Sequence, residues 1–157
     1  MKKTVSLKIT SSQYEEKLQP SGEAFVRKLE LEDSIEILTE GTMYDKNDAL
    51  YILYEESKEL MSENIRTLLK LKEDTLRIRR YTADDDDDMD MELRQGVRNI
   101  TRYKLPMLAS MDIEVYTNKL EKNLNEEGYG TISVDYRIKF DKIFTRRNIL
   151  EIEVKPA

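Results

Sequence analysis

Apolar and polar residues alternate along most of this chain, and the pattern is clearest between Ile65 and Leu93. Two reversals, at Glu73-Asp74 and around a run of aspartates, set apolar residues opposite one another and arginines opposite carboxylates, as antiparallel strands require. The resulting pairs are Thr67–Arg80, Leu69–Ile78, Leu71–Leu76, Leu76–Leu93, Ile78–Met91, Arg80–Met89, Arg77–Glu92 and Arg79–Asp90. The segment therefore predicts a three-stranded meander with one apolar face.

The same alternation predicts strands on both sides of the meander. The expected strands lie near 3–11, 35–44, 50–54, 97–103, 109–116, 131–140 and 150–155. Gly41 suggests a bulge or bend, and the residues from Asp45 to Asp48 have the composition of a hairpin turn. Residues 12–32 carry mixed signals and predict an irregular connection or a short helix.

About eight to ten short strands joined by tight turns, with no strand–helix–strand spacing, favour an all-β antiparallel fold. Closure into an up-and-down barrel would remove the two free edges of such a sheet. The length of 157 residues fits one domain, 1–157, with room for a real core.

Composition excludes several kinds of chemistry. The chain has no cysteine and no histidine, so disulfides, thiolate nucleophiles, Cys/His zinc sites and serine–histidine triads are absent. The net charge of −6 comes from one hairpin, residues 84–92, and the rest of the chain is nearly neutral. No basic face is required, so nucleic acid is not an expected partner.

The N-terminus carries two lysines but no apolar core of a signal peptide, because Lys8 interrupts it. No run approaches the roughly 20 apolar residues of a membrane-spanning helix. We expect a cytoplasmic protein without a membrane partner.

An ordered set of short motifs resembles a known family. They are Glu40-Gly41-Thr42-Met43-Tyr44, Tyr51-Ile52-Leu53-Tyr54-Glu55-Glu56, Thr67-Leu68-Leu69-Lys70-Leu71, Arg79 or Arg80, Tyr103-Lys104-Leu105-Pro106, Thr117, and Gly130 with Tyr136. Together they resemble the small bacterial YwiB-like proteins, a family of unknown function, over about Val5 to Val154. The resemblance implies a calycin-type (lipocalin-like) β-barrel and no particular activity. The chain departs from the family at Leu105-Pro106-Met107-Leu108 and in its run of aspartates.

Two acidic groups are candidates for chemistry. Asp84 to Asp88 offer hard oxygens that suit calcium, but they lack the ligand spacing of a calcium loop, and a solvated hairpin tip is the favoured interpretation. Glu40 could pair with Glu55 or Glu56 for acid/base catalysis, although a salt bridge at a strand end is favoured. The alternation of Met89, Met91 and Leu93 indicates core.

Tyrosines carry the leading hypothesis. Tyr54 and Tyr136 share apolar faces of their strands, so both are expected inside the barrel, where they suit a ligand cavity or an ordinary core. We predict ligand-binding residues Tyr54, Tyr136, Glu40 and Arg79, a small apolar ligand, no metal and no cofactor. The alternative is a structural or protein-interaction module with a filled interior, which leaves self-association open. Enzymatic activity is the least favoured function.

Overall fold

The computed structural model describes residues 2–55, 66–81, 87–103, 111–141 and 144–157, and every element in them is a strand, a turn or a short connection. The strands are β1 (Lys2–Ser21), β2 (Ala24–Lys46), β3 (Ala49–Glu55), β4 (Arg66–Lys72), β5 (Thr75–Tyr81), β6 (Asp87–Arg94), β7 (Arg98–Tyr103), β8 (Met111–Leu124), β9 (Gly130–Asp141) and β10 (Phe144–Pro156).

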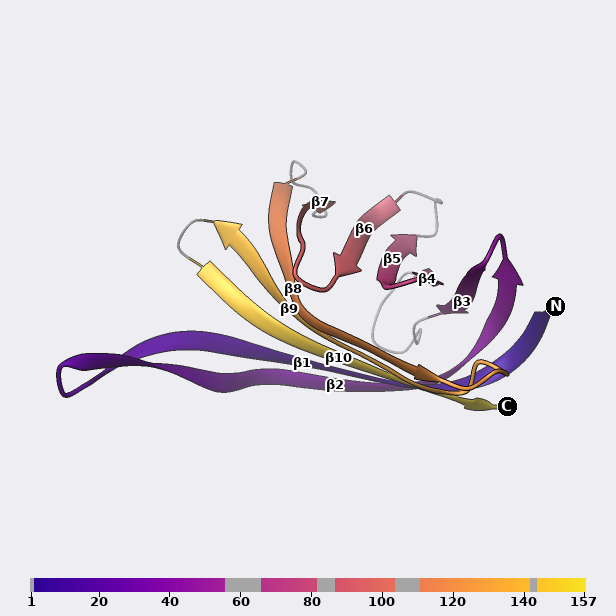
Figure 1. Ribbon diagram of the computed structural model, residues 1–157, viewed down its shortest axis with the longest axis horizontal. Helices are drawn as coiled ribbons and strands as arrows, with labels where there is room; N and C mark the ends of the chain where they lie inside the picture. Colours follow the sequence, from indigo (N-terminus) through magenta and orange to yellow (C-terminus); the bar gives the residue numbers. More distant parts are fainter. Residues whose placement is uncertain (1, 56–65, 82–86, 104–110, 142–143) are drawn as a thin grey trace.

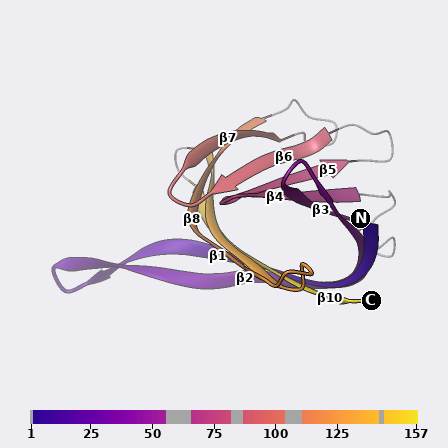
Figure 2. The same cartoon turned by 45° about the vertical axis from the view of Figure 1, so that its right-hand side comes forward.

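The strands form one antiparallel sheet that closes on itself. Each strand pairs with the next along the chain, and β1 pairs with β10 to complete a closed barrel. Figure 1 shows β8, β9 and β10 sweeping under the shorter strands β3 to β7, and Figure 2 shows the sheet curving round toward closure. The predicted all-β, up-and-down barrel is confirmed.

The predicted register of the central meander is confirmed at every pair. Leu69 lies opposite Ile78, and Ile78 lies opposite Met91. The predicted turn between β2 and β3 is also present, with Asn47 and Asp48 at φ 52° and 62°. Such positive values suit Asn and Asp in tight hairpins, because their short side chains tolerate the left-handed region.

The prediction for residues 12–32 is wrong. Instead of an irregular connection or a short helix, β1 and β2 continue as a paired ribbon to a turn at Gly22. Their register shifts once, between Gln13 and Tyr14, so that Glu32 bulges from β2. The ribbon runs well beyond the rest of the sheet in both views (Figures 1 and 2). Mixed apolar and polar residues here reflect a ribbon that leaves the core.

Packing explains Gly41 without a bulge. The register of β2 with β1 is continuous through Gly41, and the pairing of β2 with β3 begins at this residue. A Cβ at this position would lie 2.8 Å from Leu7 Cδ1 and 2.9 Å from the Leu53 carbonyl oxygen. Glycine therefore lets β2 approach its neighbours closely, which keeps the barrel closed between β2 and β3.

Described side chains from nine of the ten strands form one apolar cluster inside the barrel, and β7 contributes none of the described ones. The largest fully buried members are Leu7, Met43, Ile52, Leu69, Leu76, Met91, Leu93, Ile132 and Ile152. Met91 and Leu93 are buried, and Met89 packs against them, which confirms that these residues belong to the core. The middle of the barrel is thus occupied by its own side chains.

Candidate functional site

The barrel has two ends of different character. In an antiparallel meander alternate turns lie at the same end, so the turns after β2, β4, β6 and β8 share one end, called the mouth. The opposite end, called the far end, receives the C-terminal ends of β3 and β5 and the start of β10. Each strand has inward-facing residues at every level of the barrel, from the mouth to the far end.

Three adjacent strands present hydrogen-bonding side chains at the far end. Tyr54 on β3 lies directly opposite Thr67 on β4, which lies opposite Arg80 on β5. Tyr54 and Thr67 are buried, with 7% and 2% of their surfaces exposed. Arg80 shares the face of buried Leu76 and Ile78, since side chains alternate along a strand, and its Nε is buried. These residues form one polar row on the inner wall.

A second row lies on the other side of the interior. Thr117 on β8 pairs with Tyr136 on β9, which pairs with Asn148 on β10. All three are buried, with exposed fractions of 1%, 9% and 3%. The Asn148 Nδ2 and the Thr117 Oγ1 have no hydrogen-bond partner in the described part of the chain. Buried polar atoms without partners are rare and costly, so this row is held at the expense of stability.

Electrostatics connect the two rows. Burial raises the pKa of the Tyr136 hydroxyl to about 12, and the positive charge of Arg80 opposes that rise. The guanidinium therefore lies within electrostatic range of the Tyr136 hydroxyl. Tyr54, Thr67, Arg80, Thr117, Tyr136 and Asn148 are called the polar layer below. Every member can donate a hydrogen bond, and Arg80 supplies the positive charge.

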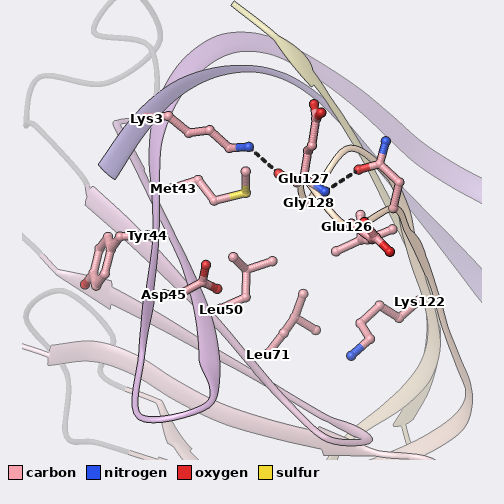
Figure 3. Close-up of a pocket in the computed structure, with 12 residues that line it drawn as sticks. Lys3, Met43, Tyr44, Asp45, Leu50, Leu71, Lys122, Glu126, Glu127 and Gly128 are labelled. Atoms are coloured by element: carbon pink, nitrogen blue, oxygen red, sulfur yellow. Dashed lines mark hydrogen bonds between the residues drawn. The ribbon is translucent and has the colours of Figure 1, made fainter. Parts of the chain in front are cut away.

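The mouth holds a pocket of about 380 Å³ with a mixed lining (Figure 3). Its apolar wall comes from Met43, Leu50, Leu71 and Leu124, and its charged wall from Lys3, Asp45, Lys122, Glu126 and Glu127. Lys3 donates to the Glu127 carbonyl oxygen, and its Nζ lies 4.3 Å from the ring centroid of Tyr129. Lys122 donates to the Glu73 carbonyl oxygen over 3.4 Å. Because two lysines and three carboxylates share this lining, the mouth favours no single ligand charge.

The structure separates the four predicted ligand-binding residues. Tyr54 and Tyr136 face the interior, as expected, but none of the pockets that open around the mouth and outer wall includes either ring. Glu40 is exposed on the outer face, and Glu55 is exposed as well, so these two carboxylates form no buried pair, and Glu56 lies outside the described residues. Arg79 lies on the outer face, 3.7 Å from the Asp90 carboxylate and over the Tyr81 ring.

Sequence reasoning missed four residues of the polar layer as site candidates: Thr67, Arg80, Thr117 and Asn148. Thr67 could have been found, because the predicted register already paired it with Arg80. Arg80 could have been found, because the predicted register already placed it on the apolar face opposite Met89. Asn148 was missed because the last strand was expected to begin near residue 150, whereas β10 begins at Phe144. Thr117 was marked only by its alternation with Val115 and by its place among the motifs that resemble the family.

Ion pairs brace the outer wall. Arg77 binds Asp90 in a bidentate contact, at 2.8 and 2.6 Å, diagonal to the predicted Arg77–Glu92 and Arg79–Asp90 pairs. Arg147 binds Asp135 in the same way, at 2.8 and 2.5 Å. The hydrogen bond from Arg147 lowers the pKa of Asp135, as that from Arg77 does for Asp90. These ion pairs lie on the outer face of the barrel and stabilise the sheet there.

Among the described residues, no group of three or more acidic side chains is arranged to hold a metal ion. Most of the aspartate run, Asp84 to Asp86, lies outside the described residues, so the cation hypothesis for it stays open. No described segment is a helix of the length and apolar character needed to cross a membrane.

Comparison with known proteins gives a family and a fold. The family model described as "Domain of unknown function (DUF1934)" matches residues 24–152. The crystal structure of the YwiB protein from Bacillus subtilis superposes with a TM-score of 0.67 at 19% identity, covering 98% of this chain and 93% of that one. No curated protein matches. At this identity the superposition is evidence for the barrel fold alone. The family model matches most of the chain, so the protein belongs to the DUF1934 family.

Proposed function

We propose that this barrel binds a small, largely apolar molecule carrying one carboxylate or phosphate group, at the polar layer of the far end. The observation that carries the proposal is the pair of facing rows, Tyr54–Thr67–Arg80 and Thr117–Tyr136–Asn148, whose members are all donors around one cation. Buried donors around an arginine are the arrangement that recognises an anionic group.

The energetics of Asn148 and Thr117 support an acceptor ligand. A buried polar atom without a partner costs about 1–3 kcal/mol, which a ligand oxygen would recover. Ordered water is the competing occupant, because it also fills sites with several polar partners. Only an anion would gain from the charge of Arg80 in addition.

The apolar part of the ligand follows from the neighbours of the polar layer. Met89 lies directly opposite Arg80, and Ile138 follows Tyr136 on the same face of β9. Both pack against the core without being fully buried. Small-molecule sites combine such apolar walls with a few convergent polar groups. The apolar ligand is therefore expected at the far end of the barrel and not in its packed middle.

Thermal unfolding with matched probes tests the proposal. Hexanoate and inorganic phosphate should raise the Tm progressively with their concentration, whereas hexanamide, which has the chain of hexanoate without its charge, should have little effect. Arg80→Leu should abolish the shift. Arg79→Leu removes a positive charge from the outer face of the same strand and should leave the Tm shift unchanged.

Two results would contradict the proposal. Equal shifts from hexanoate and hexanamide would mean that no cation takes part in binding. A shift that survives in Arg80→Leu but is lost in Arg79→Leu would move the site to the outer wall. Where Arg80→Leu fails to fold, Asn148→Leu removes a donor of the polar layer without removing a charge and serves as the second variant.

A further inference from the structure

Among the described residues, one edge of β2 is unpaired over ten residues. β2 pairs with β1 from Ala24 to Tyr44, but it pairs with β3 only from Gly41 to Lys46. Residues 31–40, called the free edge, face no strand on that side among the residues that the structure describes. In an antiparallel ladder alternate residues direct their N–H and C=O groups away from the paired strand. About half of these backbone groups therefore have no ladder partner.

The free edge also exposes apolar side chains. Leu31, Ile35 and Leu38 are 59%, 48% and 71% exposed, and they are among the four most exposed large apolar side chains that the structure describes. Isolated exposed apolar residues are ordinary, but three along one unpaired strand are a template for a further strand. Figures 1 and 2 show that β1 and β2 run out of the barrel side by side, so this edge is accessible.

The charge of the free edge selects among partners. It carries four carboxylates, Glu32, Asp33, Glu36 and Glu40, and no lysine or arginine. Glu32 is ion-paired to Arg146 at 3.3 Å, whereas Glu36 and Glu40 project from an exposed strand. A second copy of this chain would bring like charges against them, which destabilises strand pairing. A cationic strand would be attracted.

The register specifies the partner further. Ile37 lies opposite Ile9, which is buried, so Ile35 and Ile37 lie on the inner face of the sheet. Glu36, Leu38 and Glu40 lie on the outer face. A strand added here would place apolar residues beside the isoleucines and basic residues beside the glutamates. We infer that the free edge of β2 binds an extended segment of a partner protein in which basic and apolar residues alternate, by strand addition.

Fluorescence anisotropy with a labelled Lys-Val-Lys-Val-Lys-Val-Lys peptide tests this inference. The peptide should bind the full-length protein, and its Glu-Val-Glu-Val-Glu-Val-Glu counterpart should not. The double variant Glu36→Lys/Glu40→Lys should weaken binding at least tenfold. The matched control Glu126→Lys/Glu127→Lys changes the net charge equally at the turn after β8 and should weaken it less than threefold.

Residue-resolved amide exchange locates the binding. Alternate amides of residues 31–40 should exchange fast in the free protein and become protected by the peptide. Equal weakening in the two double variants would overturn the inference, because attraction would then be a property of net charge. Amides that are all protected without peptide would also overturn it, since the edge would then be covered by the protein's own chain. A dimer that is seen in sedimentation and strengthened by Glu36→Lys/Glu40→Lys would overturn the inference as well, because the edge would then pair with a second copy.

Discussion

The mouth half and the far half of the barrel interior are made by the same strands but filled differently. Toward the mouth, β3, β4 and β5 contribute Ile52, Leu69 and Leu76, all buried in one apolar cluster. Two to four residues farther along, the same strands contribute Tyr54, Thr67 and Arg80. The first half stabilises the barrel by burial. The second half also holds Thr117 and Asn148, whose Oγ1 and Nδ2 are buried and have no partner among the described residues.

The two halves therefore contribute differently to stability. A barrel meant only to be stable would continue the apolar filling to both ends, because well-packed apolar residues replace buried polar groups at little or no cost. Polar groups retained at a cost to stability are typical of functional sites. The predictions below test that division.

The largest effect is expected from a charge placed in the apolar half. Ile78→Asp would bury a carboxylate between Leu69 and Met91 and should lower the free energy of unfolding by about 3–5 kcal/mol. Arg79→Ala, on the outer face of the same strand, should lower it by about 0.2–1 kcal/mol. Urea melts measure both, and equal losses would mean that the faces of β5 are assigned the wrong way round.

A pH-dependent effect is expected from Tyr136. Because its pKa in the folded protein is raised to about 12, the contribution to stability is complete below the ordinary pKa of about 10 and is lost as the pH rises from 10 to 12. The loss should reach about 2–3 kcal/mol. Tyr136→Phe should remove this part of the alkaline decline. Tyr116→Phe, on the outer face, should leave the alkaline decline in stability unchanged. An unchanged decline in Tyr136→Phe would contradict a buried Tyr136 hydroxyl.

The next effect is a gain in stability. Asn148→Leu replaces a buried amide without a partner for its Nδ2 and should raise the free energy of unfolding of the ligand-free protein by about 1–3 kcal/mol. Asn118 is the matched control, because its Nδ2 donates to Asp135 at 3.2 Å. Asn118→Leu should lower stability by about 0.5–1.5 kcal/mol. A loss of stability in Asn148→Leu would mean that the amide is satisfied in the free protein.

The smallest effect concerns the outer wall. The hydrogen bond from Arg147 lowers the pKa of Asp135, so its contribution to stability is present above pH 4 and is lost as the pH falls through the folded-state pKa. Asp135→Asn should cost about 1 kcal/mol at neutral pH and less in acid. Thermal melts between pH 2 and 7 would show this convergence, and a constant difference would contradict it.

Local rules predicted the meander, because one register satisfies apolar pairing and charge pairing together. They failed at residues 12–32, where β1 and β2 continue as a paired ribbon beyond the rest of the sheet (Figure 1). The site was predicted in part. Tyr54 and Tyr136 follow from alternation alone, whereas Arg79 was chosen over Arg80 although the register already favoured Arg80 for the interior.

The remaining residues of the polar layer depend on how the barrel closes. Asn148 and Thr117 become neighbours of Tyr136 through pairings of β10 and β8 with β9. The approach of Arg80 to Tyr136 spans the interior and depends on the number and tilt of all ten strands. Alternation along a strand specifies faces but not which faces meet across a barrel.

The side-chain amide signal of Asn148 gives the most direct test of the central claim. In NMR spectra recorded during titration with hexanoate, that signal and the Arg80 Nε–H signal should move together and saturate with one dissociation constant. The NMR signals of Met43 and Leu71, at the mouth, should not move. Shifts confined to the mouth, or an Asn148 signal that never changes while other signals saturate, would contradict an anion site at the far end of the barrel.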